Sequence, residues 1–243
     1  MPELTERQLH ILKAIIEDYI ETAEPVGSET LDKKYNLGVS PATIRNEMVK
    51  LTHLGYLKQP HTSAGRTPTS GALKLYVDKL MKLKELSVAE EVTVRQKIWD
   101  YRTEMDKMLR EATKALARQS KTMSLAATED GDIYTSGMGN ILEMPEFYDI
   151  DITRHLLDTL DEYGYWWNIF SHLYDNPDPL AILLGEEFGG QVLKECGGVF
   201  VRFSSDTHRG AIGVVGSSRL DYSHIIPLVR YMGELISDMA KNW

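Results

Sequence analysis

Apolar residues near the start of the chain recur every three or four positions, which is the spacing of one buried face of a helix. Thr5 is a suitable N-cap, and Gln8 is placed to complete a capping box with it, so a first helix is expected to run to about Thr22. The repeat in this segment is formed by Leu9, Leu12, Ile16 and Tyr19.

Two further helices are predicted between residues 28 and 55. Ser28 is expected to cap a short helix that ends near Tyr35, and Gly38 suits the tight turn that follows. Ser40 is expected to cap the third helix, and Pro41 occupies its first position, where the missing N–H costs nothing. The third helix is predicted to bury Ile44, Met48, Leu51 and Leu54.

The residues after Gly55 predict a slender two-stranded loop. A short strand is expected at 56–58, a loop at 59–65 and a return strand at 66–69. Helix, turn, helix and a two-stranded loop together are typical of a winged helix-turn-helix. A further helix is expected from Ser70 to about Leu86.

A heptad register then follows, with apolar residues stepping alternately by four and three. Two interpretations stay open: a long helix lying across its own C-terminal domain, or a coiled-coil seam with a second chain. The register is formed by Val94, Ile98, Tyr101, Met105, Met108, Ala112 and Ala115.

The pattern changes near Met123, where short apolar segments alternate with amphipathic ones. The predicted fold class is α+β: a winged helix at 1–69, linking and possible dimerisation helices at 70–121, and a C-terminal α/β domain at 122–243. In the last part, strands are expected at 133–134, 180–184, 199–203 and 211–215, and helices at 152–163 and 223–243.

Charge is distributed unevenly along the chain. The net charge of the 243 residues is -9, yet residues 33–84 contain ten Lys and Arg against two Asp and Glu. Such a local positive field attracts a polyanion, although lysines also decorate ordinary solvated faces. Charge alone leaves both interpretations open.

The predicted third helix and loop carry side chains suited to DNA. Steps of 100° place Thr43, Arg45, Asn46 and Lys50 away from the buried stripe. Asparagine can pair with adenine, and the cations can bind guanine or phosphate. In the loop, Gly65 is expected to turn the chain sharply and to present Arg66 to a minor groove. Added phosphate contacts are expected from Lys58, His61, Thr62 and Thr67.

Other chemistry is poorly supported by the residues. Cys196 is the single cysteine, the histidines lack zinc spacing, and no catalytic constellation is present, so no enzyme, cofactor or metal is expected. The segment 165–167, Tyr-Trp-Trp, is interpreted either as core or interface aromatics or as the lining of a ligand pocket. No apolar run would span a bilayer and no signal peptide begins the chain, so a cytoplasmic location is expected.

Several motifs resemble the HrcA family of heat-inducible transcription repressors. They are "EPVGS", "SPATIRNEM", "GYL.QPHTSAGR.PT" and "YVD" in the first 78 residues, and "GMGNILEMPEF" and "GAIGVVGSSRLDYSHIIPLV" further on. The resemblance implies a homodimer with a winged-helix head and a GAF-like C-terminal domain. It also implies an inverted-repeat operator in double-stranded DNA upstream of chaperone genes, and dependence on a GroEL-type chaperonin.

The same resemblance implies which residues contact DNA. Ser40, Thr43, Arg45 and Asn46 match the part of the motif that lies at the groove. Thr62, Ser63, Gly65 and Arg66 match the wing.

The chain also departs from the family pattern. Ala72 and Leu73 stand where the family usually has an aromatic residue and an arginine, and the chain is short for the family. An inserted dimerisation subdomain expected after residue 120 is missing or much reduced. We therefore hypothesise that the heptad helix at 94–115 supplies some of the dimer contact.

Two other function classes stay open beside a repressor. In a ligand-sensing regulator, the C-terminal domain would bind a metabolite and shift DNA affinity. In a protein-interaction adaptor, the winged helix would have no DNA role. Binding to a duplex distinguishes the repressor and the ligand-sensing regulator from the adaptor. Thermal shifts with candidate metabolites distinguish the ligand-sensing regulator from the repressor.

Overall fold

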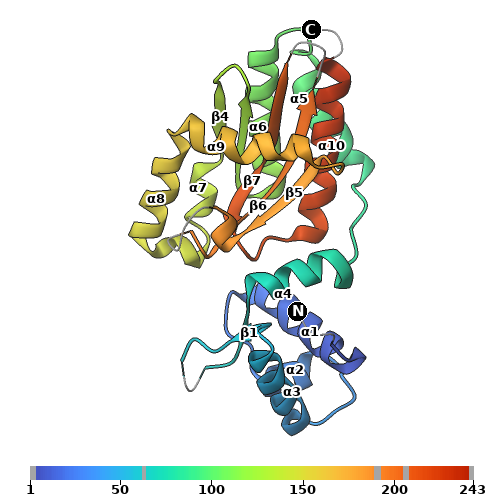
Figure 1. The fold of residues 1–243 in the computed structure, drawn as a ribbon. Helices are drawn as coiled ribbons and strands as arrows, with labels where there is room; N and C mark the ends of the chain where they lie inside the picture. The colour runs from blue at the N-terminus through green and yellow to red at the C-terminus, as the bar shows by residue number, and fades with distance from the viewer. Residues whose placement is uncertain (1–3, 62–63, 189–192, 205–207, 241–243) are drawn as a thin grey trace. The chain divides into compact units, whose positions relative to one another are not determined.

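The structure is a computed structural model that describes residues 4–61, 64–188, 193–204 and 208–240. The chain divides into two compact units, Met1–Lys82 and Leu83–Trp243 (Figure 1). Within the described residues, none of the helices combines the length and apolar character that crossing a bilayer requires.

The first unit has the predicted winged-helix architecture. Its two short strands pair antiparallel, with Leu57 opposite Pro68, and an antiparallel bridge from Val26 to Arg66 adds a third segment to this small sheet. The elements are α1 (Glu6–Thr22), α2 (Ser28–Lys34), α3 (Pro41–His53), β1 (Leu57–Lys58), β2 (Thr67–Pro68), α4 (Ser70–Leu75) and the π-helix η1 (Tyr76–Leu80).

The helix ends test the predicted caps. The Thr5 and Gln8 capping box is confirmed, and the Ser40 hydroxyl accepts a hydrogen bond from the Thr43 N–H as an N-cap does. The prediction that Ser28 caps α2 is wrong. Ser28 is the first helical residue and is buried, while the cap position is held by Gly27 without a side-chain hydrogen bond.

The segment after the wing belongs to the first unit. Helical structure ends at Leu80, short of the predicted end near Leu86. α4 packs on β2 and α1, η1 packs on α1, and Leu73 and Tyr76 are buried there. The first compact unit therefore continues to Lys82, whereas the sequence placed the end of the winged helix at residue 69.

The second unit is built on one antiparallel sheet with the strand order β4-β3-β7-β6-β5. Its strands are β3 (Met123–Thr128), β4 (Ile133–Ser136), β5 (Leu180–Leu184), β6 (Cys196–Ser204) and β7 (Arg209–Ser217). Its α-helices are α5 (Val88–Trp99), α6 (Met105–Ser120), α7 (Met138–Ile141), α8 (Ile150–Leu160), α9 (Tyr163–Ser171) and α10 (Tyr222–Ala240). Its 3₁₀ turns are η2 (Pro145–Tyr148), η3 (His172–Asp175) and η4 (Gly185–Phe188).

Helices cover both faces of this sheet. α6 and α10 pack on one face, and α8 and α9 lie against the other (Figure 1). On the second face Trp166 and Phe170 of α9 meet Phe200 of β6, and Leu125 of β3 joins the same core. The predicted fold class, a winged helix with a GAF-like α/β domain, is confirmed.

The heptad segment does not form one helix. α5 ends at Trp99, and α6 begins at Met105 and packs against α5. Ile98 and Met108 are fully buried in the second unit. The coiled-coil interpretation of this register is therefore wrong, because the chain's own domain already covers these side chains.

Candidate DNA-binding surface

α3 has one buried side and one exposed side, as the sequence predicted. Ile44 and Leu51 are fully buried, whereas Arg45, Asn46 and Lys50 are exposed. Among the residues that the structure describes, Arg45 and Asn46 have no side-chain hydrogen bond or ion pair. Their polar groups are thus available to an external partner.

The start of α3 presents hydroxyl groups that already contact each other. The Ser40 and Thr43 hydroxyl oxygens are 3.0 Å apart, and Ser40 also accepts from the Thr43 N–H at 3.3 Å. Both residues lie on the surface at the end where backbone N–H groups point outward. This end can therefore receive a phosphate, with the hydroxyls in a fixed orientation.

Lys50 is less available than its exposure suggests. Its ammonium group is 2.9 Å from a carboxylate oxygen of Glu47, which is largely buried and also accepts a hydrogen bond from Gln8 of α1 at 3.1 Å. The hydrogen bond from Lys50 holds the pKa of Glu47 below its usual value. The negative charge of Glu47 therefore lies under the exposed side of α3 and compensates the positive charge of Lys50.

Arg66 lies at the base of the wing. Its backbone pairs with Val26 through two hydrogen bonds of 2.9 Å. Its side chain turns toward α3, where Nε donates to the Thr52 hydroxyl at 3.1 Å. The sequence predicted a cation presented by the loop, but the Arg66 side chain is half-buried and hydrogen-bonded to α3.

Gly65 is required by a close approach of two backbones. A Cβ atom added there would lie 2.3 Å from the Val26 carbonyl oxygen, which is well inside any normal contact. Its φ angle is not in the left-handed region that favours glycine. Gly65 therefore lets Arg66 pair with Val26, which differs from the sharp turn that the sequence predicted.

Arg45 and Arg66 line the same cavity, of about 320 Å³, between α2, α3 and the wing. Ser28 at the start of α2 and Gln59 at the start of the loop also line it. Two guanidinium groups at one small cavity favour an anion with several acceptor oxygens. The pocket can therefore accept an anion such as a phosphate.

The remaining wing residues are mixed in their exposure. Lys58 and His61 are exposed, while Thr62 and Ser63 lie outside the described residues. Thr67 is 5% exposed, so the expectation that it contacts phosphate is wrong. It sits in β2 with its side chain turned into the first unit.

The basic block is partly neutralised by the fold. Lys34 of α2 lies 2.7 Å from a carboxylate oxygen of Asp18 and 2.6 Å from one of Glu21. These hydrogen bonds raise the pKa of Lys34 above its usual value. The positive potential near α3 therefore depends more on Arg45 and Arg66 than a count of charges suggests.

The second unit offers little support for a ligand pocket at the aromatic segment. Trp166 is fully buried and its indole N–H donates to the Thr159 carbonyl oxygen at 2.8 Å, so its core interpretation is confirmed. Cys196 is also fully buried, and burial raises the pKa of its thiol to about 12. Among the described residues, no cluster of three His, Cys, Asp or Glu side chains could hold a metal ion.

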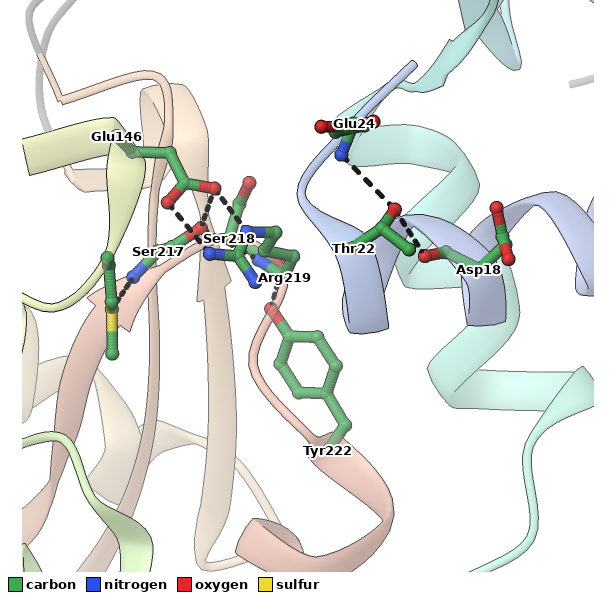
Figure 2. A network of polar contacts seen from close by, with 9 residues as sticks. Asp18, Thr22, Glu24, Glu146, Ser217, Ser218, Arg219 and Tyr222 are labelled. Atoms are coloured by element: carbon green, nitrogen blue, oxygen red, sulfur yellow. Dashed lines mark hydrogen bonds and ion pairs between the residues drawn. The ribbon is translucent and has the colours of Figure 1, made fainter. Parts of the chain in front are cut away.

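A buried ion pair instead fixes the segment before α8 to the end of β7. The guanidinium of Arg219 donates from Nε and Nη2 to the two carboxylate oxygens of Glu146, which also accepts from Ser217 at 2.7 Å (Figure 2). The Arg219 and Glu146 side chains are only 14% and 11% exposed. Both belong to the predicted family motifs, and their contact gives these motifs a structural role.

Some contributors to the surface were not predicted from sequence. Thr52 orients Arg66, Val26 pairs with it, and Gln59 donates from its amide to the Ala64 carbonyl oxygen at 3.1 Å. Only Val26 had a signal, since it lies in the "EPVGS" motif. Thr52 acts through a contact with a residue 14 positions away, and Gln59 acts through a contact within the loop, five positions away.

Two family models match the chain. The model described as "Winged helix-turn-helix transcription repressor, HrcA DNA-binding" matches residues 3–92, and "HrcA protein C terminal domain" matches residues 74–226. Together they include both units of the structure.

Individual relatives agree with these matches. A "Heat-inducible transcription repressor HrcA" from Syntrophobacter fumaroxidans is 27% identical over 344 aligned positions, which cover 100% of this chain and 99% of the relative. The protein of the same name from Clostridium acetobutylicum is 50% identical over 120 residues, which are 49% of this chain and 35% of the relative. Because the first alignment is longer than the 243 residues of this chain, the chain lacks internal stretches that the relative contains.

One solved structure shares the fold over its whole length. A crystal structure described as that of "a hypothetical protein" superposes with a TM-score of 0.82 and 19% identity. The superposition covers 98% of this chain and 99% of that one. At this identity, the likeness concerns the fold alone.

Proposed function

Because the chain belongs to the HrcA family of heat-inducible transcription repressors, we propose that it represses chaperone genes by binding an inverted-repeat operator as a homodimer. Its N-terminal unit is a winged-helix DNA-binding domain of that family. Each copy inserts α3 into a major groove and sets the base of its wing against the adjacent backbone. Occupying the promoter then blocks transcription.

Asn46 is the proposed base-reading residue. It is exposed on α3, and among the described residues it has no competing side-chain partner. The amide can donate to and accept from adenine at the same time, which is worth about 1–3 kcal/mol of discrimination. Thr43 lies one turn closer to the start of α3, where it contacts the neighbouring base or phosphate.

Arg45 and Arg66 are the proposed phosphate clamp. The single observation that carries the proposal is their shared cavity of about 320 Å³ between α3 and the wing. One DNA phosphate in this cavity would accept hydrogen bonds from both guanidinium groups and fix the depth of α3 in the groove. Lys58 and His61, with Ser63 and Thr62 of the wing, extend the contact along the backbone.

We infer the heat response from the family and from the dependence of apparent operator affinity on the folded fraction of the repressor. We place the repressor in the cytoplasm, where a GroEL-type chaperonin raises its folded fraction. The apparent affinity for the operator falls in proportion as that fraction falls. Heat therefore relieves repression when unfolded proteins occupy the chaperonin.

Selection of bound duplexes from a random pool tests this function. The expected result is an inverted repeat whose half-sites lie about one helical turn or a multiple of it apart, as two related recognition helices require. Recovery of unrelated sequences without symmetry would contradict the proposed operator.

Two substitutions separate the proposed roles on the selected duplex. Asn46→Ala should weaken binding and relax preference at one base position, by about 1–3 kcal/mol. Arg66→Ala should weaken binding to all sequences alike and reduce the salt dependence. Asn168→Ala in α9 and Arg154→Ala in α8 remove exposed residues of the same types from the other unit, so they are the matched controls. Equal effects of Asn46→Ala on every duplex would remove the base-reading assignment.

A further inference from the structure

α5 carries apolar side chains on two different sides. Val94 and Ile98 face the interior of the second unit, to which α5 belongs, and are fully buried. Val88, Val92 and Trp99 are 76%, 44% and 43% exposed. At 100° per residue these last three lie within about 40° of one another around the helix, so they form an apolar stripe on one side of α5, which Arg95 interrupts between Val92 and Trp99.

Arginines flank the far end of this stripe. The guanidinium carbons of Arg95 and Arg102 lie 5.4 and 4.8 Å from the centroid of the Trp99 ring. Stacking of this kind stabilises an exposed indole and fixes two positive charges beside it. The C-terminal end of α5 and the turn that follows it are therefore both apolar and positively charged.

α10 supplies a row of the opposite charge. A cavity of about 490 Å³ lies between the end of α5 and α10, and Arg95, Trp99, Glu234 and Asp238 are among the residues that line it. The two helices are held together here, since the Tyr231 hydroxyl donates to the Glu91 carbonyl oxygen at 3.3 Å. Arg95 and Arg102, the arginine row, thus face Glu234 and Asp238, the acidic row, across one cavity that Trp99 also lines.

We propose that this α5/α10 face binds the same face of a second copy of the chain and forms the homodimer. A two-fold axis requires a surface that is complementary to itself. When two copies meet in this way, the arginine row of one lies over the acidic row of the other, and the Val88, Val92 and Trp99 stripes bury each other. The proposal rests on the proposed function, because an inverted repeat needs two copies.

The other surfaces considered for the dimer are less suitable. The predicted seam at 94–115 is covered inside the second unit, since Ile98 and Met108 are fully buried. The chain also lacks internal stretches present in the relative from Syntrophobacter fumaroxidans. A charge pattern that complements itself favours a second copy over a partner of one charge sign or a small apolar ligand.

Sedimentation velocity of the full chain tests the stripe. Val92→Glu should convert the dimer into a monomer at a concentration where the unchanged chain sediments as a dimer. Leu142→Glu changes another exposed apolar residue of the same unit, 56% exposed, and should leave the dimer intact. An unchanged chain that is monomeric, or a Val92→Glu variant that remains a dimer with an unaltered circular dichroism spectrum, would overturn the proposal.

Mixing two charge-reversed variants tests the paired rows. Arg95→Glu with Arg102→Glu gives two acidic rows, and Glu234→Arg with Asp238→Arg gives two basic rows, so each variant alone should be monomeric. An equimolar mixture should regain the dimer, because every acidic row then meets a basic one. Rescue on mixing cannot arise from contacts within one chain. A mixture that stays monomeric would refute the opposed rows.

DNA binding distinguishes this proposal from the proposed function. Monomeric Val92→Glu should still bind a single half-site taken from the selected duplexes as the unchanged chain does, but should lose the tighter binding to the full inverted repeat. If half-site binding is present and the dimer is unaffected by the variants, only the α5/α10 face is wrong. If no duplex is bound by any form, the proposed function itself fails.

Discussion

The Nε of Arg66 donates a hydrogen bond to the Thr52 hydroxyl, 3.1 Å away, and this contact joins the base of the wing to α3. The wing and the proposed recognition helix are therefore held in one arrangement before DNA arrives. Such preorganisation lowers the ordering cost of binding. We therefore expect Thr52, which is not itself a predicted DNA-contacting residue, to influence DNA affinity through Arg66.

Thr52→Val should weaken DNA binding without unfolding the first unit. Valine keeps the shape of threonine but removes the acceptor, so Arg66 loses a fixed orientation. A loss of about 1 kcal/mol, roughly fivefold in Kd, is expected from fluorescence anisotropy with the selected duplex. Thr52→Ser keeps the hydroxyl and should bind as the unchanged chain does. Equal affinities for the valine and serine variants would show that the contact is irrelevant to binding.

Gly65→Ala should disrupt the base of the wing. The new methyl group would meet the Val26 carbonyl oxygen at 2.3 Å, and backbone must move to relieve the contact. We expect a loss of about 1–3 kcal/mol in the free energy of unfolding, as for other overpacked sites, together with weaker DNA binding. Gly164→Ala, where no atom lies within 4 Å of the added carbon, is the control and should not destabilise the chain. Urea titration measures the stability of both variants. An unaltered unfolding midpoint for Gly65→Ala would contradict the close approach of the two backbones.

Glu47→Gln should change the pH dependence of stability. The pKa of Glu47 is lowered in the folded chain, chiefly by the hydrogen bond from Lys50, so the ionised group stabilises the fold above its ordinary pKa of 4.5. This contribution is lost as the pH falls through the lower, folded pKa. The unchanged chain should therefore exceed Glu47→Gln in stability at neutral pH, and the difference should shrink on acidification below about 4.5. A difference that grows on acidification would contradict the assignment.

The same substitution removes a negative charge from beneath the exposed side of α3. Glu47→Gln should therefore bind DNA more tightly at low salt, since Lys50 then adds an uncompensated charge. Glu29→Gln on α2 removes an exposed carboxylate from the same unit and serves as the comparison. If both variants gain affinity equally, only net charge matters and the position under α3 does not.

Glu146→Ala should strongly destabilise the second unit. It leaves Arg219 as a nearly buried charge without the carboxylate that accepts its bidentate hydrogen bonds (Figure 2). Removing one partner of such a pair costs about 3–5 kcal/mol. Glu143→Ala, at an exposed position three residues earlier, should have little effect. Calorimetry that finds both variants equally stable would contradict a structural role for the pair.

Local signals predicted the winged helix well. The capping box of Thr5 and Gln8, the Ser40 cap with Pro41, and the apolar stripe of α3 depend only on neighbours within a few residues. All are present except the last member of the stripe, Leu54, which is half-buried and follows the end of α3. The exposed side of α3 followed from the same helical period. Sequence could predict this much because the period of one helix fixes both its buried and its exposed side.

Features that depend on distant contacts were not predictable in the same way. The heptad pattern fits one straight helix or two helices of matching phase, and only packing of α5 on α6 decides between them. β3 was not predicted because all six of its residues are buried. It therefore lacks the alternation of apolar and polar residues that marks a strand with one solvent-exposed face. The place of Arg66 depends on Val26 and Thr52, which are remote in sequence.

DNA binding through α3 and the wing is best measured as the affinity of the purified chain for double-stranded DNA, by anisotropy over a series of salt concentrations. The logarithm of the binding constant should fall linearly with the logarithm of salt concentration, by about 0.9 for each phosphate contacted, and Arg66→Ala should lower the slope by about one. Failure to bind any selected or random duplex at low salt, or a slope that Arg66→Ala leaves unchanged, would contradict this mode of DNA binding.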